Sequence, residues 1–378
     1  MKDVMGIIYT SKDEYSLREL SSKRTVTAIP LAARYRLVDF LLSNFVNSGV
    51  RKVGVLMQGN YHSLMDHLGS GKEWDLHTRS NGLYILPPFH NEDGSNTYKG
   101  ILDALRANSD YLRRSSQSMV LIVGGNYVYN TVFDDMQKFH EEKDADITVM
   151  YTRFDPQTFE YSGSSHNDRT FVNVNKDGYV TDMEINPNVI TYPNVLMDVI
   201  LIKRTLLMHL TDNAVARGNH NLYSDVLRNE IENGGLKVAA YEYKGYVRRV
   251  ETIKSYFNLN MDLLNKDVRA ELFGKNPVYT KTRTDAPTRH LPGSKVTNSL
   301  VADGCVIEGE VDGCVLFRGV KICKGAKLKN AIIMQDCYIG ENTELENVIL
   351  DKDVTILSEC RLIGHKQYPV VMGKNVTL

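Results

Sequence analysis

A spacing of 17 residues repeats through the last quarter of the chain and constrains its fold more than any other feature. Apolar residues recur at this step in three series: Cys305, Ile322, Ile339 and Ile356; Val311, Leu328, Leu345 and Leu362; Leu316, Ile333 and Leu350. Each period therefore offers three inward-facing side chains, separated by five or six residues. Short strands stacked coil on coil, one for each of three faces, fit this pattern, whereas the frequent glycines oppose a helix. The sequence predicts a three-sided β-helix.

The residues before this repeat alternate short apolar runs with amphipathic segments. The runs Val4–Tyr9, Val53–Met57 and Met119–Val123 predict buried strands, and Val38–Asn47 predicts one of the helices between them. Strands that alternate with helices indicate right-handed crossovers and a mainly parallel sheet that is covered on both faces. From Phe171 onward, closely spaced strands predict an antiparallel insert.

Length and composition fit two globular domains. We expect an α/β domain over residues 1–275, a linker with three Pro and one Gly over 276–293, and the β-helix over 294–378. The formal net charge of −1 argues against nucleic acid or an anionic membrane as the main partner, and no apolar run could span a bilayer. The five cysteines match no zinc spacing or closed disulfide framework, and the N-terminus does not resemble a secretory signal. A reduced, cytoplasmic setting is expected.

Two segments resemble one family of sugar-phosphate nucleotidyltransferases. Residues 33–50, ARYRLVDFLLSNFVNSGV, are similar to the KYRIIDFxLSNxxNSGI stretch of ADP-glucose pyrophosphorylases, and residues 299–309, SLVADGCVIEG, are similar to the first coils of that family. The resemblance implies a Rossmann-like nucleotidyltransferase domain followed by a left-handed β-helix of hexapeptide-type coils. These enzymes join glucose 1-phosphate to ATP and release pyrophosphate, which yields ADP-glucose for glycogen synthesis.

This chain departs from the family at the positions that carry its chemistry. The resemblance places an arginine of the nucleotide loop at Ser16, in a stretch that has lost its glycines, and a lysine of the next motif at Val26. It places the two metal-binding aspartates at Asn126 and Arg249, and the lysine that holds the sugar phosphate at Asn186. Asparagine is a neutral ligand and arginine repels a cation, so Mg²⁺ loses both charged ligands. We predict that this chain binds no metal or other cofactor and is catalytically impaired.

Other family positions are kept. Three basic residues match positions at which the family is thought to bind phosphorylated effectors: Lys23, Arg24 and Arg36. Such cations suit a phosphate-binding surface, although a solvated basic face explains them equally well. Gln58 matches a glutamine that relays effector binding, with ordinary loop hydrogen bonding as the alternative. Tyr98 and Asp103 keep part of a substrate-pocket pattern, in which Asp103 could instead brace the adjacent helix.

The loss of site residues on a preserved scaffold resembles the non-catalytic, GlgD-type subunits of this family. By that resemblance the chain assembles with a catalytic-type subunit, as a heterotetramer in which only the partner holds Mg²⁺, and tunes the activity or the effector response of that partner. Two alternatives stay open. One is an active sugar-1-phosphate nucleotidyltransferase with a rearranged metal site, in which Glu251 supplies a carboxylate. The other is a stand-alone sensor of sugar phosphates or nucleotides.

Overall fold

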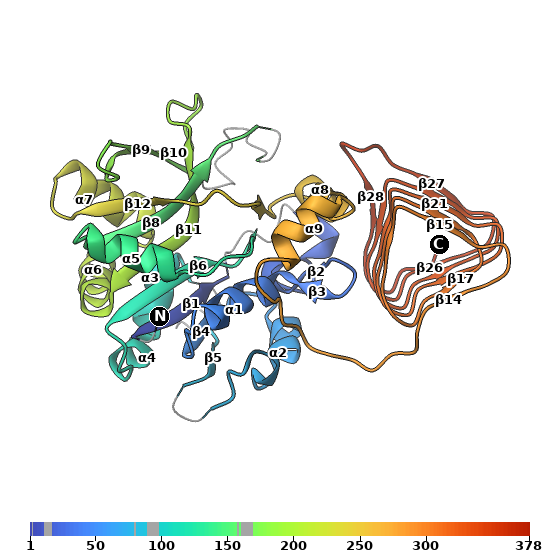
Figure 1. Cartoon of the computed structure of the whole chain (residues 1–378), viewed down its shortest axis with the longest axis horizontal. Helices are drawn as coiled ribbons and strands as arrows, with labels where there is room; N and C mark the ends of the chain where they lie inside the picture. Colours follow the sequence, from blue (N-terminus) through green and yellow to red (C-terminus); the bar gives the residue numbers. More distant parts are fainter. Residues whose placement is uncertain (2, 11–16, 79–80, 89–97, 157–158, 160–168) are drawn as a thin grey trace.

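Two parts make up the molecule, an N-terminal part built on a nine-stranded sheet and a C-terminal β-helix (Figure 1). The structure, a computed structural model, describes residues 1, 3–10, 17–78, 81–88, 98–156, 159 and 169–378. Within these residues, no helix is long and apolar enough to cross a membrane. The predicted fold class, an α/β nucleotidyltransferase-type domain followed by a left-handed β-helix, is confirmed.

The centre of the nine-stranded sheet is parallel. β1 (Val4–Tyr9) lies between β4 (Val53–Leu56) and β6 (Met119–Gly124) and pairs with both in parallel. β5 (Leu83–Leu86) adds to the outer edge of β4, again in parallel. β-Branched residues fill β1, β4 and β6 and are buried there, as expected of a sheet that is covered on both faces.

The other half of the sheet is largely antiparallel. β11 (Asn194–Lys203) runs antiparallel to β6 and pairs on its other side with β8 (Ile147–Arg153) and β9 (Thr170–Val174). β10 (Val180–Ile185) pairs with β9 as an antiparallel hairpin, and β12 (Val238–Glu242) pairs with β8 in parallel. The antiparallel insert predicted from Phe171 onward is therefore present.

Helices cover both faces of this sheet, and each face has its own apolar cluster. The first cluster takes residues from α1 (Leu37–Asn47), α2 (His62–Leu68) and α5 (Asp134–Glu142). The second takes residues from α3 (Ile101–Ala107), α4 (Ser109–Arg113) and α6 (Arg204–Ala216). The remaining α-helices and strands of this part are α7 (Arg228–Glu232), α8 (Ile253–Asp262), α9 (Lys266–Phe273), β2 (Pro30–Leu31), β3 (Tyr35–Arg36), β7 (Tyr127–Val128) and β13 (Arg248–Arg249).

The C-terminal part is a stack of coils whose strands form three parallel five-stranded sheets. The first sheet contains β14 (Arg289–His290), β17 (Val306–Ile307), β20 (Lys321–Ile322), β23 (Tyr338–Ile339) and β26 (Thr355–Ile356). The second contains β15 (Lys295–Thr297), β18 (Glu310–Asp312), β21 (Lys327–Lys329), β24 (Glu344–Glu346) and β27 (Arg361–Ile363). The third contains β16 (Leu300–Val301), β19 (Val315–Leu316), β22 (Ile332–Ile333), β25 (Val348–Leu350) and β28 (Val370–Met372).

The strand register bears out the 17-residue period except at its first member. Two of the series, those that begin with Val311 and Leu316, pair as predicted. Ile322 pairs with Ile307 and not with Cys305, because the turn between β17 and β18 is shorter than the turn between β20 and β21. Cys305 is still fully buried in the core of the coils. The prediction that it faces inward is therefore confirmed, and the prediction that it pairs with Ile322 is wrong.

The two parts share a continuous apolar interface. A third cluster contains Leu20 and Phe257 of the N-terminal part together with Phe317 and Ile349 of the coils. The connecting segment is also held to the N-terminal part by several hydrogen bonds, among them one that the Thr280 hydroxyl donates to the buried carboxylate of Asp39 at 2.5 Å. β14 lies inside the stretch predicted as a linker and already pairs with β17, so the β-helix begins before residue 294.

Candidate functional site

A pocket lies at the carboxyl ends of the parallel strands β1 and β6, with a cavity volume of about 190 Å³. Tyr9 at the end of β1 and Gly124 at the end of β6 form its floor, and Ile200 of β11 lines one wall. Ligands of open α/β sheets bind outside this edge, because neighbouring connections leave in opposite directions there and open a crevice. The fold thus places a cavity where a nucleotidyl transferase would need one.

The two positions at which the resemblance expects metal-binding aspartates, Asn126 and Arg249, come together in this pocket. They approach because β13 pairs with β7, and the backbone N–H of Val250 donates to the carbonyl of Asn126 at 2.8 Å. Both side chains are buried. The guanidinium of Arg249 lies 5.4 Å above the ring of Tyr127, which adds a cation–π contact.

Arg249 belongs to a row of four charges of alternating sign, of which three are buried and Asp198 is partly exposed. Its Nε lies 2.6 Å from Oε1 of Glu251, and its Nη2 lies 4.0 Å from Oδ2 of Asp198. The second oxygen of Glu251 accepts from Nη2 of Arg169 at 2.6 Å. Arg169 and Glu251 are both nearly inaccessible to solvent. Since a buried charge is stable only with a partner, the row holds together as a unit.

Like Arg169, Asp198 is a member of the row that sequence reasoning missed. It sits in an irregularity of β11, between Leu196 and Ile200, and its φ of 53° lies in the left-handed region that a non-glycine residue rarely adopts. Burial raises the pKa of its carboxyl group, and the nearby Arg249 partly opposes that shift. A single acid within the otherwise apolar run of β11 is the signal that could have revealed it.

Asn186, the position of the sugar-phosphate lysine, lies beside the row and braces it. Its Oδ1 accepts from the backbone N–H of Arg169 at 2.7 Å, and its own N–H donates to the Arg169 carbonyl at 2.9 Å. Its φ of 50° is also in the left-handed region. The neutral side chain thus holds the backbone of Arg169 where a family lysine would hold phosphate.

Tyr98 and Asp103 support the rim of the pocket. The Oδ2 atom of Asp103 accepts from the backbone N–H of Lys99 at 3.0 Å, and Oδ1 lies 2.6 Å from Nδ1 of His220. Tyr98 is buried and its hydroxyl lies 3.2 Å from Nδ2 of Asn108. Neither side chain is among the described residues that line the pocket, whereas Lys99 itself is. The two residues therefore shape the turn before α3.

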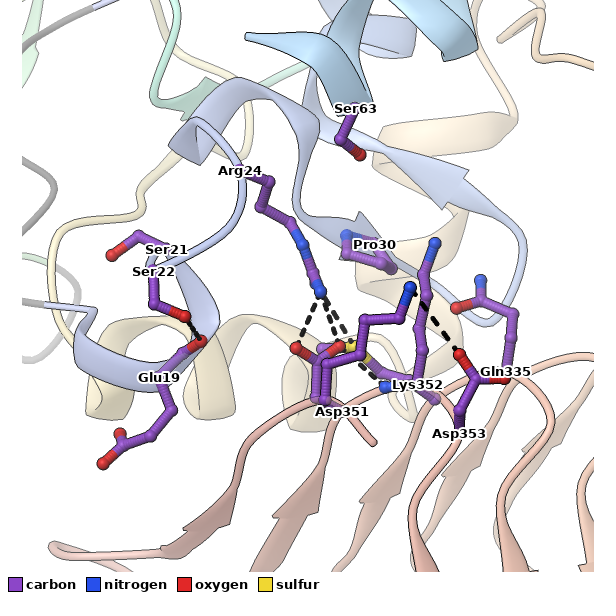
Figure 2. A network of polar contacts seen from close by, with 12 residues as sticks. Glu19, Ser21, Ser22, Arg24, Pro30, Ser63, Gln335, Asp351, Lys352 and Asp353 are labelled. Carbon is purple, nitrogen blue, oxygen red and sulfur yellow. Dashed lines mark hydrogen bonds and ion pairs between the residues drawn. The ribbon is translucent and has the colours of Figure 1, made fainter. Parts of the chain in front are cut away.

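A second polar region lies between the two parts of the molecule (Figure 2). Arg24 reaches from the N-terminal part to Asp351 of the β-helix, and its Nη2 lies 2.8 and 2.7 Å from the two carboxylate oxygens. Both residues are buried. Of the three basic residues predicted to bind effectors, Arg24 is thus committed to an internal ion pair, while Lys23 is exposed.

The same interface contains positive charge with weaker compensation. Nη1 of Arg36 donates to the carbonyl of Ser63 at 2.7 Å and lies 3.1 Å from its hydroxyl, which are neutral partners. Burial lowers the pKa of Arg36 to about 10, although Asp39 opposes the shift. Lys352, beside Asp351, is a residue that sequence reasoning missed. Burial first, and then the charges of Arg36 and Arg24, lower its pKa to about 8.

Known proteins resemble the chain along its whole length. A family model of nucleotidyl transferases matches residues 15–161, and one of GlmU-like C-terminal hexapeptides matches residues 284–368. The glycogen biosynthesis protein GlgD of Bacillus subtilis (strain 168) is 34% identical over 377 residues, which cover 99% of this chain and 96% of that protein. The chain belongs to the GlgD and glucose-1-phosphate adenylyltransferase family. The glucose-1-phosphate adenylyltransferase of Clostridium botulinum (strain Eklund 17B / Type B) is 31% identical, over 93% of this chain and 96% of its own.

Membership of the adenylyltransferase family implies Mg²⁺, and the residues of the pocket do not fit it. Asn126 offers one neutral oxygen, and the cation of Arg249 stands at the second aspartate position. Glu251, the carboxylate that a rearranged metal site would need, is held by two arginines. Among the described residues, no group of three His, Cys, Asp or Glu side chains could hold a metal ion.

The remaining family positions lie away from the charged row. Val26 is buried in the short helical turn Val26–Ala28 and belongs to the apolar interface between the two parts. Ser16 lies outside the described residues. Gln58, at the end of β4, donates from Nε2 to the hydroxyl of Tyr9 at 2.7 Å, and Tyr9 lines the pocket. Gln58, which the family resemblance predicts to relay effector binding, therefore reaches the pocket through the side chain of Tyr9.

Proposed function

We propose that this chain is a regulatory, catalytically impaired subunit of a glucose-1-phosphate adenylyltransferase in glycogen biosynthesis, acting through a catalytic partner of the same family. The contact of Arg249 with Glu251 carries this proposal. Nucleotidyl transfer requires positive charge, usually Mg²⁺, that is free to neutralise the phosphates in the transition state. Here the guanidinium at that position already neutralises a carboxylate of its own chain, which supports a role other than catalysis.

The preserved scaffold supports a role in assembly. The sheet, the coils and the buried interface between them are intact although the chemistry has been lost. A subunit of this kind would change the activity of a neighbour by making different contacts with its active and inactive conformations. We propose a hetero-oligomer with a catalytic-type subunit, most simply a heterotetramer.

The interface between the two parts is the place where we propose that a phosphorylated effector binds. Arg36 has neutral partners and Lys352 lies in a positive field, so an anion would be stabilised beside them. Arg24 is better explained as the bridge between the two parts, because Asp351 already satisfies it. Lys23 is an exposed cation in the sequence next to Arg24 and would contribute long-range attraction.

Co-expression tests the proposal. The chain is produced with a catalytic-type adenylyltransferase, and the complex is assayed for ADP-glucose formation with and without sugar bisphosphates or AMP. We expect co-purification and a change in kcat or in the effector response relative to the catalytic subunit alone. The variant Arg36→Gln should still co-purify but alter the effector response. Failure to co-purify, together with unchanged kinetics, would leave the stand-alone sensor as the better explanation.

Assay of the isolated chain tests the enzymatic alternative. ATP, glucose 1-phosphate and Mg²⁺ are supplied at high protein concentration, and pyrophosphate release is followed. The proposal expects turnover no higher than that of a chain with Arg249→Ala. Sustained turnover that disappears on removal of Mg²⁺ would show a rearranged metal site and would contradict the regulatory role.

A further inference from the structure

A further cleft lies between α8, the turn that follows it, and one corner of the β-helix. α8 packs beside the coils near β28 (Figure 1). The cleft has a volume of about 510 Å³, within the range of about 300–1,000 Å³ that is usual for ligand sites. We propose that it binds a short, neutral oligosaccharide through side-chain amides. The inference does not rest on the proposed role toward a partner subunit.

This cleft is separate from the positively charged region between the two parts. Asn347 lines the cleft and stands directly before β25, whereas Asp351 and Lys352 directly follow that strand. The cleft and the bridge from Arg24 to Asp351 therefore lie at opposite ends of the third sheet. The anion-binding residues proposed above do not line it.

Side-chain amides from three segments converge on the cleft. They belong to Asn258 on α8, to Asn265 before α9, and to Asn298, Asn330 and Asn347 at the corner between the second and third sheets. Within the described part of the chain, the side chains of Asn258, Asn298 and Asn330 make no hydrogen bond. Asn265 uses its Oδ1, which accepts from a backbone N–H at the start of α9 at 2.9 Å. An amide donates and accepts, as a sugar hydroxyl does, so these groups suit a ligand rich in hydroxyls.

Asn347 adds an acceptor that its own chain leaves unsatisfied. Its Nδ2 donates to the carbonyl of Gly364 at 3.0 Å, but its Oδ1 has no partner among the described residues. The residue is only 6% exposed, so bulk solvent does not satisfy this oxygen. A buried acceptor without a donor is costly, and a hydroxyl of a ligand in the cleft would supply the donor.

The backbone of the corner does not by itself explain why its residues are uncharged. Asn298, Asn330 and Asn347 have φ values of 41°, 48° and 52°, in the left-handed region that asparagine tolerates. At the other corners of the β-helix, however, left-handed positions include the acids Asp336 and Glu359. Amides without acids thus stand at the corner that faces the cleft.

The remaining walls of the cleft suit a sugar ring better than a phosphate. Phe257, Met261 and Leu264 form an apolar wall on which the C–H face of a pyranose can lie. Lys366 is the one charged side chain among the described residues of the lining, and it is exposed, so solvent and salt screen it. Its ammonium group also donates to hydroxyl groups.

The length of the amide row favours several rings over one. Asn298 and Asn347 are separated by three strand steps, from β15 through β18 and β21 to β24. At about 4.8 Å for each step, the row is about 14 Å long. A single sugar ring is too short to contact both ends, so the ligand class is an oligosaccharide.

Calorimetric titration of the purified chain tests the inference. Maltotriose and cellotriose, which join the same glucose units by α and β linkages, are each titrated beside glucose as the single-ring reference. We expect at least one trisaccharide to bind, and glucose to bind at least about tenfold more weakly, because it contacts only part of the row. The affinity should not change between low and high salt, since no ion pair forms. The trisaccharide that binds identifies the linkage.

Matched variants locate the binding in the cleft. Asn330→Gly removes an amide from the row but keeps a residue that favours the left-handed conformation, and Asn342→Gly makes the same change at another corner, where φ is 52°. Asn330→Gly and Asn258→Ala should each weaken trisaccharide binding about tenfold, whereas Asn342→Gly should not change it. Thermal unfolding checks that each variant is folded.

Three results would overturn the inference: no binding of either trisaccharide at millimolar concentration, an equal loss in Asn342→Gly, or a marked loss of affinity at high salt. None of them bears on co-purification with a catalytic subunit, so the two proposals fail separately.

Discussion

The pocket and the interface between the two parts both bury arginines, but they compensate them differently. Beside the pocket, Arg249 and Arg169 share one glutamate, and the row that they form with Asp198 is electrically neutral. At the interface, Arg24 is paired with Asp351, whereas Arg36 donates to neutral oxygens and the pKa of Lys352 is lowered to about 8. Beside the pocket, the buried arginines are matched by carboxylates of the same chain, whereas the interface contains positive charge with neutral partners.

Breaking the row at its centre should have the largest effect. Glu251→Ala leaves the guanidinium groups of Arg169 and Arg249 buried without their shared partner. We expect the free energy of unfolding to fall by about 5 kcal/mol, because an uncompensated buried charge keeps its full desolvation cost. Urea unfolding measures this change, and a loss below about 1 kcal/mol would show that the four charges do not form a structural unit.

Breaking the bridge between the two parts should cost somewhat less. Arg24→Ala leaves the Asp351 carboxylate unpaired at the apolar interface, and we expect about 3 kcal/mol of destabilisation. Because the bridge connects the two parts, calorimetry should also resolve two unfolding transitions in place of one. The double variant Arg24→Met with Asp351→Leu serves as the control and should recover most of the lost stability. A single transition with unchanged midpoint would contradict the bridging role.

Titration of Lys352 should alter anion binding at the interface. Its pKa of about 8 means that the side chain is charged below pH 8 and neutral above it. A bound anion favours the charged form, so affinity for sulfate, which stays a dianion throughout, should fall about tenfold as pH rises from 7 to 9. Lys352→Gln should remove this pH dependence. Equal pH dependence in the variant would assign it to another group.

An exposed ion pair provides the small-effect reference for both regions. Nζ of Lys329 lies 3.5 Å from Oε1 of Glu346 on the outer face of the coils. Because solvent screens the pair, Lys329→Ala should change the free energy of unfolding by less than about 1 kcal/mol. The same urea experiment measures it. A loss as large as that of Glu251→Ala would mean that burial does not govern the other two results.

The sequence predicted contacts between residues that are close along the chain better than contacts between distant segments. The coil ladders repeat locally, so Val311 and Leu328 could be paired from spacing alone, and only the shorter first turn misplaced Cys305. The prediction that Asn126 and Arg249 stand where the family has metal-binding aspartates also came from short motifs. The charged row around Arg249 could not be predicted from such motifs, because Asp198 comes from a different strand and its orientation depends on a local irregularity of β11.

The interface was predicted less completely for the same reason. Arg24 and Arg36 stood out as basic residues in one segment, but nothing local to Arg24 indicates that a carboxylate 327 residues further along the chain binds it. Lys352 lies beside that carboxylate in a coil, where lysines on the outer faces are common. Pairing of this kind depends on how two domains dock, and a single sequence contains no direct record of docking.

The separation of Arg24 from Asp351 has a consequence for how the protein is made. During synthesis Arg24 emerges long before the coil that carries Asp351, since 327 residues separate the two partners. Arg24 and the apolar surface around Val26 must therefore stay in contact with water until the coils have formed and docked. The nascent chain therefore exposes an aggregation-prone surface until the β-helix has been synthesised. Its yield in a cell should then depend on how quickly the β-helix folds and docks.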